Sequence, residues 1–259
     1  MPYLDVEGAR VFWRTDGHPD APALVLANSL GSDTSLWDGI VPRLMQDHHV
    51  IRLDLPGHGA SDVSGTKAAW TVPELALHVL RAADAGGAAA FDFVGVSIGG
   101  MIGLHLAARS GRVNKLVVSN TAASSDPAIW MERIRISREK GLQPLVSGTM
   151  QRWFAPEFVA ADSPQLATIR EHFLQVDPRG YAGCCAAIRD VDLLKELQQI
   201  RIPTLVISGK NDMAMPAGAS NSIASAIQGS RHLELPVAHI PHVEDPLPFL
   251  DAVSTHLKS

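Results

Sequence analysis

Short apolar runs alternate with helical patterns through the first half of the chain, and this alternation limits the possible folds more than any other feature. The runs are apolar on both faces, which is typical of parallel strands covered by helices on both sides of a sheet. An alternating pattern with Gly8 at its turn predicts an antiparallel meander before them. Expected strands are 3–7, 10–14, 23–27, 50–54, 91–96, 115–119, 202–208 and 231–235.

The stretch 126–199 breaks this alternation, because it is helical throughout, is punctuated by prolines and contains no convincing strand. We therefore predict an α/β fold. It has an eight-stranded, mostly parallel sheet with helices on both faces and a helical lid inserted after the sixth strand. Residues 1–125 and 200–259 would form the core domain, and 126–199 the cap. Expected core helices are 36–45, one opened by the capping box Thr71–Glu74, 101–109, 217–227 and 247–257.

The charge balance excludes several classes of partner. The chain has 22 Lys and Arg against 27 Asp and Glu, a formal charge of −5, and its basic residues are scattered. No patch for nucleic acid is indicated, and no apolar run is long enough to span a membrane. We expect a small-molecule partner, with the oligomeric state, a homo-oligomer included, left open.

Two adjacent cysteines, Cys184 and Cys185, are the only ones in the chain. A bridge between neighbours is strained, and no histidine or cysteine pair stands at metal-ligand spacing, so we expect buried, reduced cap residues and no metal site. The first residues carry no signal-peptide pattern. Both observations favour a cytoplasmic location.

The segment Gly95-Val96-Ser97-Ile98-Gly99-Gly100 lies between an apolar strand and a helical pattern. This context is typical of a nucleophile elbow, in which small neighbours let the strand and helix backbones pass closely. Ser97 is therefore the candidate nucleophile.

A serine hydroxyl needs a base, and the base needs a carboxylate to orient it. His239 directly follows the last expected strand, whereas His242 is a local rival. Asp212 follows the preceding strand, and Asp126 is the alternative acid. The order Ser97, Asp212, His239 is the chain order of α/β-hydrolases, so we expect the α/β fold to be of the α/β-hydrolase type.

Two backbone amides are candidates for the oxyanion hole of an acyl transfer. Ile98 follows the nucleophile at a helix N-terminus, and Leu30 lies in the loop Asn28-Ser29-Leu30-Gly31 after a strand. Other hydrolases carry His-Gly where Asn28-Ser29 stands.

Several strings resemble the 3-oxoadipate enol-lactonases over most of the chain. Asn28-Ser29, the Ser119–Ala123 string and lid motifs with the paired cysteines are the more specific matches, whereas the elbow and Asp54–Ser61 are shared across α/β-hydrolases. The matching strings are 28–31, 54–61, 95–100, 118–123, 152–154 and 181–190. The sequence departs from the family pattern at Ile240-Pro241-His242.

The resemblance implies hydrolysis of 3-oxoadipate enol-lactone to 3-oxoadipate in the β-ketoadipate pathway of catechol and protocatechuate degradation, with no cofactor. It carries the triad onto Ser97, Asp212 and His239. An anionic lactone requires local cations, and this favours Arg133 with Trp153, with Trp130 and Ser29 as further contacts. Another lactonase, a carboxylesterase, a C–C bond hydrolase and a slow ligand-binding receptor of this fold are the alternatives.

Overall fold

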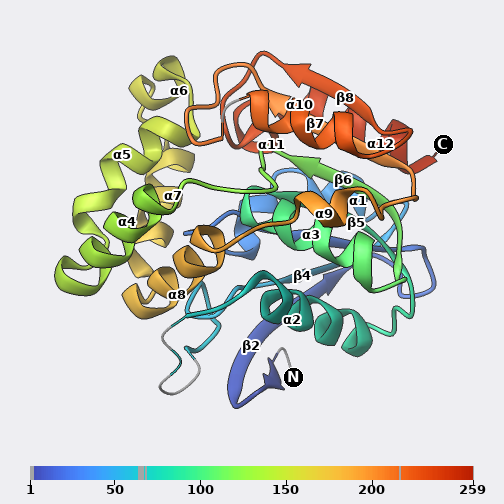
Figure 1. The fold of residues 1–259 in the computed structure, drawn as a ribbon, viewed down its shortest axis with the longest axis horizontal. Coiled ribbons are helices and arrows are strands. Elements are labelled where there is room, and N and C mark those ends of the chain that lie inside the picture. The colour runs from blue at the N-terminus through green and yellow to red at the C-terminus, as the bar shows by residue number, and fades with distance from the viewer. Residues whose placement is uncertain (1–2, 64–66, 68, 216, 259) are drawn as a thin grey trace.

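A sheet of eight strands runs through the centre of the molecule in the computed structural model (Figure 1). The structure describes residues 3–63, 67, 69–215 and 217–258. The strand order is β1-β2-β4-β3-β5-β6-β7-β8. The strands are β1 (Tyr3–Val6), β2 (Ala9–Asp16), β3 (Ala23–Ala27), β4 (His49–Leu53), β5 (Phe91–Val96), β6 (Val113–Ser119), β7 (Thr204–Gly209) and β8 (Arg231–Leu235).

The pairing of these strands sets where functional side chains can gather. β1 pairs with β2, and β2 with β4, in the antiparallel sense, and every other pair is parallel. The carboxyl ends of β3, β5, β6, β7 and β8 therefore meet at one edge of the sheet. Every residue of β5 is buried, as expected for a strand covered on both faces. The predicted sheet is confirmed, although β6 and β7 begin two residues away from the expected positions.

Helices cover the sheet on both sides (Figure 1). The predicted capping box is confirmed at the start of α2, where the Thr71 amide donates to a Glu74 carboxylate oxygen at 2.8 Å. The helices flanking the sheet are α1 (Val41–Leu44), α2 (Val72–Ala85), α3 (Ile98–Arg109), α10 (Ala217–Ala226), α11 (Pro241–Glu244) and α12 (Pro246–Lys258), with a 3-10 helix, η1, at Thr34–Trp37.

The prediction of one helix over 36–45 is wrong. The stretch divides into η1 and α1, and Asp33 caps η1 by accepting the Ser35 amide at 2.8 Å. Pro42 lies in the first turn of α1, where its missing N–H is tolerated. Inside a continuous helix it would remove a hydrogen bond, which explains the break.

The chain between β6 and β7 forms six helices, which we call the helical segment. α4 to α8 cluster on one side of the molecule, whereas α9 lies against α3 (Figure 1). The helices are α4 (Pro127–Lys140), α5 (Gln143–Trp153), α6 (Pro156–Ala160), α7 (Pro164–Gln175), α8 (Pro178–Arg189) and α9 (Leu194–Leu197). Among the residues described, none of the helices combines the length and apolar character that crossing a bilayer requires.

Candidate active site

Ser97 lies at the sharp turn between β5 and α3. Its backbone has φ 59° and ψ −121°, which an L-residue adopts only under strain. A Cβ added at Gly95 would lie 2.3 Å from the carbonyl oxygen of Gly99. One added at Gly99 would lie 2.3 Å from that of Ala27. Both glycines are therefore required for β3, β5 and α3 to pass this closely, and the turn holds Ser97 at the carboxyl edge of the sheet.

Asp212 and His239 meet at the same edge, in the loops after β7 and β8. His239 Nδ1 lies 2.9 Å from Asp212 Oδ2, and both side chains are almost fully buried. The other carboxylate oxygen, Oδ1, accepts the amides of Ala214 at 2.7 Å and Met215 at 2.9 Å. Because an ionised carboxylate only accepts, His239 Nδ1 carries the proton and Nε2 is left as the basic nitrogen.

One cavity of about 310 Å³ is lined by both Ser97 and His239. Ser97 is 4% exposed, so it is buried at the base of its turn and faces this cavity. Within the described residues no hydrogen bond joins the Ser97 hydroxyl to the imidazole. In unliganded enzymes this contact is often long and tightens when substrate binds. The arrangement can therefore support proton transfer from a serine attacking a bound carbonyl.

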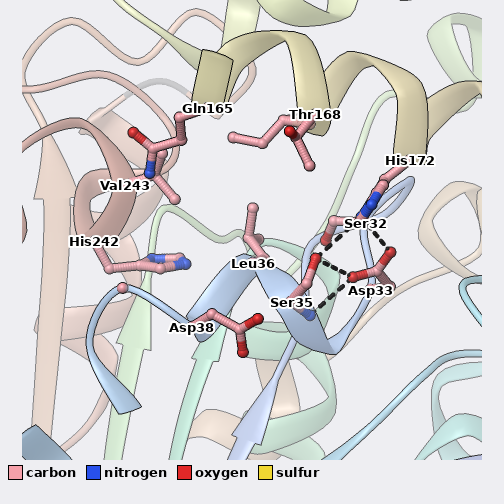
Figure 2. Close-up of a pocket in the computed structure, with 12 residues that line it drawn as sticks. Ser32, Asp33, Ser35, Leu36, Asp38, Gln165, Thr168, His172, His242 and Val243 are labelled. Atoms are coloured by element: carbon pink, nitrogen blue, oxygen red, sulfur yellow. Dashed lines mark hydrogen bonds and ion pairs between the residues drawn. The ribbon is translucent and has the colours of Figure 1, made fainter. Parts of the chain in front are cut away.

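The rival histidine, His242, lies elsewhere. Its ring stacks on Trp37 with centroids 4.0 Å apart, and burial lowers its pKa to about 3. It lines a second cavity of about 350 Å³ between η1, α7 and α11, where Asp33 contacts Ser35 and His172 (Figure 2). The structure thus separates His242 from Ser97 and Asp212.

The rival acid, Asp126, is exposed at the start of α4. Its side chain accepts the Ala128 amide at 2.9 Å, so it acts as a helix cap. The carboxylate that contacts His239 is that of Asp212.

The two candidate oxyanion-hole residues flank the nucleophile. Ile98 is the first residue of α3, where the backbone N–H has no partner within the helix. Leu30 lines the cavity from the loop after β3. The close approach of Gly99 to Ala27 brings this loop against the start of α3.

All four expected substrate contacts line the cavity. Ser29 comes from the loop after β3, Trp130 and Arg133 from α4, and Trp153 from the end of α5. The Arg133 guanidinium lies 4.8 Å from the centre of the Trp130 ring. The Ser29 hydroxyl is buried and has no hydrogen-bond partner among the described residues. Arg133, Trp130 and Trp153 thus make part of the cavity lining cationic and aromatic.

Two further cavity residues, Arg152 and Tyr181, were not predicted as contacts. Burial, with Arg133 nearby, lowers the pKa of Arg152 to about 10. Within the described chain neither Arg133 nor Arg152 forms an ion pair with a carboxylate. The pairing of Arg152 with Trp153 in sequence was a usable signal, whereas nothing local in the sequence marks Tyr181.

The two cysteines are buried in α8 and unbridged, as predicted. Burial raises the pKa of the Cys185 thiol to about 12 and also holds that of Cys184 well above its ordinary value, so neither is a reactive thiolate. Among the described residues no group of histidine, cysteine or acidic side chains is arranged to hold a metal ion.

A mostly parallel sheet with a strained serine at a strand–helix turn, beside a buried Asp–His pair, defines an α/β-hydrolase. The model of the alpha/beta hydrolase family matches residues 24–252. The chain is 34% identical to 3-oxoadipate enol-lactonase 2 of Acinetobacter baylyi over 258 residues, which cover 98% of this chain and 96% of the relative. It is 30% identical to enol-lactonase 1 of the same organism, over 98% of this chain and 95% of the relative.

A solved enol-lactonase from Burkholderia xenovorans LB400 is similar to this structure with a TM-score of 0.96 and 36% identity, over 100% of both chains. A hydrolase from Pseudomonas aeruginosa PA01 has a TM-score of 0.95 at 34% identity, over 99% of this chain and 98% of the other. The chain therefore belongs to the alpha/beta hydrolase family and, within it, to the family of the 3-oxoadipate enol-lactonases.

Proposed function

We propose that the protein hydrolyses 3-oxoadipate enol-lactone to 3-oxoadipate, in the β-ketoadipate pathway of aromatic compound degradation. The observation that carries this proposal is that Ser97 and His239, whose Nδ1 contacts Asp212, line one cavity with two arginines that have no carboxylate partner among the described residues. The full-length similarity to enol-lactonases supports the same substrate.

In this proposal Ser97 Oγ attacks the lactone carbonyl while His239 Nε2 takes its proton. The oxyanion that develops is stabilised by the amides of Leu30 and Ile98. The ring C–O bond then breaks, and the enol oxygen receives the proton from His239. Asp212 stabilises the imidazolium between these steps.

Water completes the reaction by attacking the acyl-enzyme. His239 accepts a proton from the water, and the Ser97 oxygen leaves with that proton as the carboxylic acid forms. The enol product converts to its ketone, so the reverse reaction loses its substrate. This scheme requires no metal or organic cofactor.

The substrate carboxylate has to be attracted by a protein whose formal charge is −5. We propose that Arg133, with Arg152 beside it, supplies the local positive potential, and that Trp130, Trp153 and Ser29 contact the bound lactone. The lowered pKa of Arg152 supports this, since two neighbouring guanidinium groups favour an anion between them.

We further propose that 126–199 acts as a cap over a core formed by 1–125 and 200–259. Support comes from the cavity itself, because α4 and α5 supply one wall and the sheet edge supplies the other. A cytoplasmic location fits the two unbridged thiols. The small anionic lactone, rather than nucleic acid or a membrane, is the partner we propose, and a homo-oligomer is compatible with this function.

Turnover of 3-oxoadipate enol-lactone tests the proposal. We expect a kcat on the order of 10 s⁻¹, typical of an enzyme. A rate near one event per minute would instead indicate a receptor that keeps the fold. A higher kcat/KM on the neutral ester 4-nitrophenyl acetate would assign the protein to the carboxylesterases.

A further inference from the structure

Asn120 joins the two loops that carry the proposed acid and base. It is the first residue after β6 and is 1% exposed. Its side-chain Nδ2 lies 2.8 Å from Asp212 Oδ2 and 3.0 Å from the backbone oxygen of Ala238, the residue before His239. One amide group thus contacts the acid and the loop of the base at the same time.

The orientation of this amide follows from its neighbours. The Asp212 carboxylate and the Ala238 carbonyl both accept, so the group facing them is the NH₂ and not the oxygen. The Asn120 oxygen is then left to accept the Ser119 hydroxyl at 2.7 Å. Every polar atom of the side chain is used, which fixes its position in a buried site.

The backbone also selects this residue type. Asn120 has φ 50°, in the left-handed region that asparagine tolerates better than most residues. Its own N–H donates to Ile207 of β7 at 3.0 Å. Position 120 therefore requires a residue that tolerates a left-handed backbone conformation and has a short side chain that donates two hydrogen bonds.

We propose that Asn120 is a positioning residue that holds the Asp212 carboxylate and the His239 loop in the relative position required for proton transfer. Its side chain bonds to Ser119, Asp212 and Ala238, and it is not among the residues that line the cavity, so it acts through Asp212 and Ala238. This inference rests on the proposed roles of Asp212 and His239.

Two substitutions with different chemistry test this inference. Asn120→Gly keeps the left-handed backbone and removes the side chain. We expect kcat for 4-nitrophenyl acetate to fall by about 10-fold to 100-fold at every pH, with KM within about threefold, since a hydrogen bond to a charged group is lost.

Asn120→Asp replaces the donor with a carboxyl group facing two acceptors. Two carboxylates this close share a proton at low pH, and the protonated form can still donate to Asp212. As pH rises the shared proton is lost and the two charges repel. We therefore expect a new alkaline limb in the kcat profile that the parent protein lacks.

The titratable groups facing this position are Asp212 and His239, with Glu244 of α11 one step away, where it accepts the Ala238 amide at 3.1 Å. Asn114→Asp is the matched control, because it makes the same chemical change at an exposed position of β6. Its kcat profile should keep the parent's shape.

Two results would overturn the inference. One is an Asn120→Gly protein that folds, by circular dichroism, with kcat within about threefold of the parent. The other is an Asn120→Asp protein whose profile of kcat against pH has the parent's shape. This second result would overturn the inference even if the glycine variant does not fold. A parent that turns over 4-nitrophenyl acetate but not the enol-lactone contradicts the proposed substrate and leaves this test intact.

Discussion

The sheet edge and the helical segment differ in how far their polar side chains are paired. At the edge, both oxygens of Asp212 are saturated with hydrogen bonds, and Asn120 uses every polar atom. In the helical segment, Arg133 and Arg152 lack a carboxylate partner among the described residues. A saturated network is rigid and pre-organised, whereas unneutralised cations are completed by an anionic ligand. We infer that the edge determines the reaction and the helical segment determines the substrate.

The two regions are nevertheless joined by hydrogen bonds beside the base. The Trp153 carbonyl at the end of α5 accepts the amides of His239 at 3.0 Å and Ile240 at 3.2 Å. Glu244 accepts the amides of Ala238 at 3.1 Å and Ala155 at 3.3 Å. The base is therefore positioned partly by the helical segment, and substitutions can show how far the division of roles holds.

The largest effect is expected for Ser97→Ala at the sheet edge. Loss of the nucleophile should lower kcat for the enol-lactone by about 10⁶-fold, because no covalent intermediate can form. Stopped-flow absorbance with 4-nitrophenyl acetate should also show no acylation burst, while circular dichroism stays unchanged. Retained turnover would place the nucleophile outside the sheet edge.

His239→Gln and His242→Phe form a matched pair. The first should lower kcat by about 10⁶-fold, nearly as much as loss of the nucleophile, because the base and the nucleophile act together. The second should leave kcat within about threefold, because phenylalanine keeps the stacking on Trp37. Steady-state kinetics on the enol-lactone distinguishes them, and equal losses would mean that His242 takes part in the chemistry.

Arg133→Ala and Arg152→Ala test the role of the helical segment. Each should raise KM for the anionic lactone by about 10-fold to 100-fold, the range of a charge-assisted hydrogen bond, and leave KM for 4-nitrophenyl acetate nearly unchanged. Arg135→Ala is the control on the same helix, since Arg135 is exposed and ion-paired with Glu132 and Glu139. An equal rise in KM for both substrates would show that these arginines do not select the anionic lactone. The helical segment would then not determine the substrate.

The smallest effect concerns stability in acid. Burial lowers the pKa of His242 to about 3 in the folded state, against about 6.5 when unfolded. Between these values only the unfolded chain binds the proton, so the stabilising contribution is present above pH 6.5 and is lost as pH falls. From pH 7 to pH 5 this histidine should cost about 2 kcal/mol of unfolding free energy.

Urea unfolding at the two pH values measures this cost. The His242→Phe protein should lose about 2 kcal/mol less than the parent over the same interval. His58 and His78, whose pKa burial lowers to about 4, destabilise both proteins equally. Identical losses in the two proteins would show that His242 is not buried as a neutral group.

Local sequence was sufficient for the sheet, for α2 and for the elbow, because turn glycines, capping residues and apolar runs act over a few positions. It failed at 36–45, where the cap at Asp33 and the break at Pro42 outweighed the helical pattern. Asn120 and Tyr181 could not be assigned from sequence, since their partners lie far along the chain and meet only in the folded protein.

In the proposed mechanism Ser97, Asp212 and His239 act as one catalytic unit. Mass spectrometry of peptides after acid quench of enol-lactone turnover tests it directly. We expect an acyl group on the peptide that contains Ser97, formed rapidly in the parent and not detected in His239→Gln. An acyl group on another residue, or turnover with no acyl-enzyme at any quench time, would contradict it.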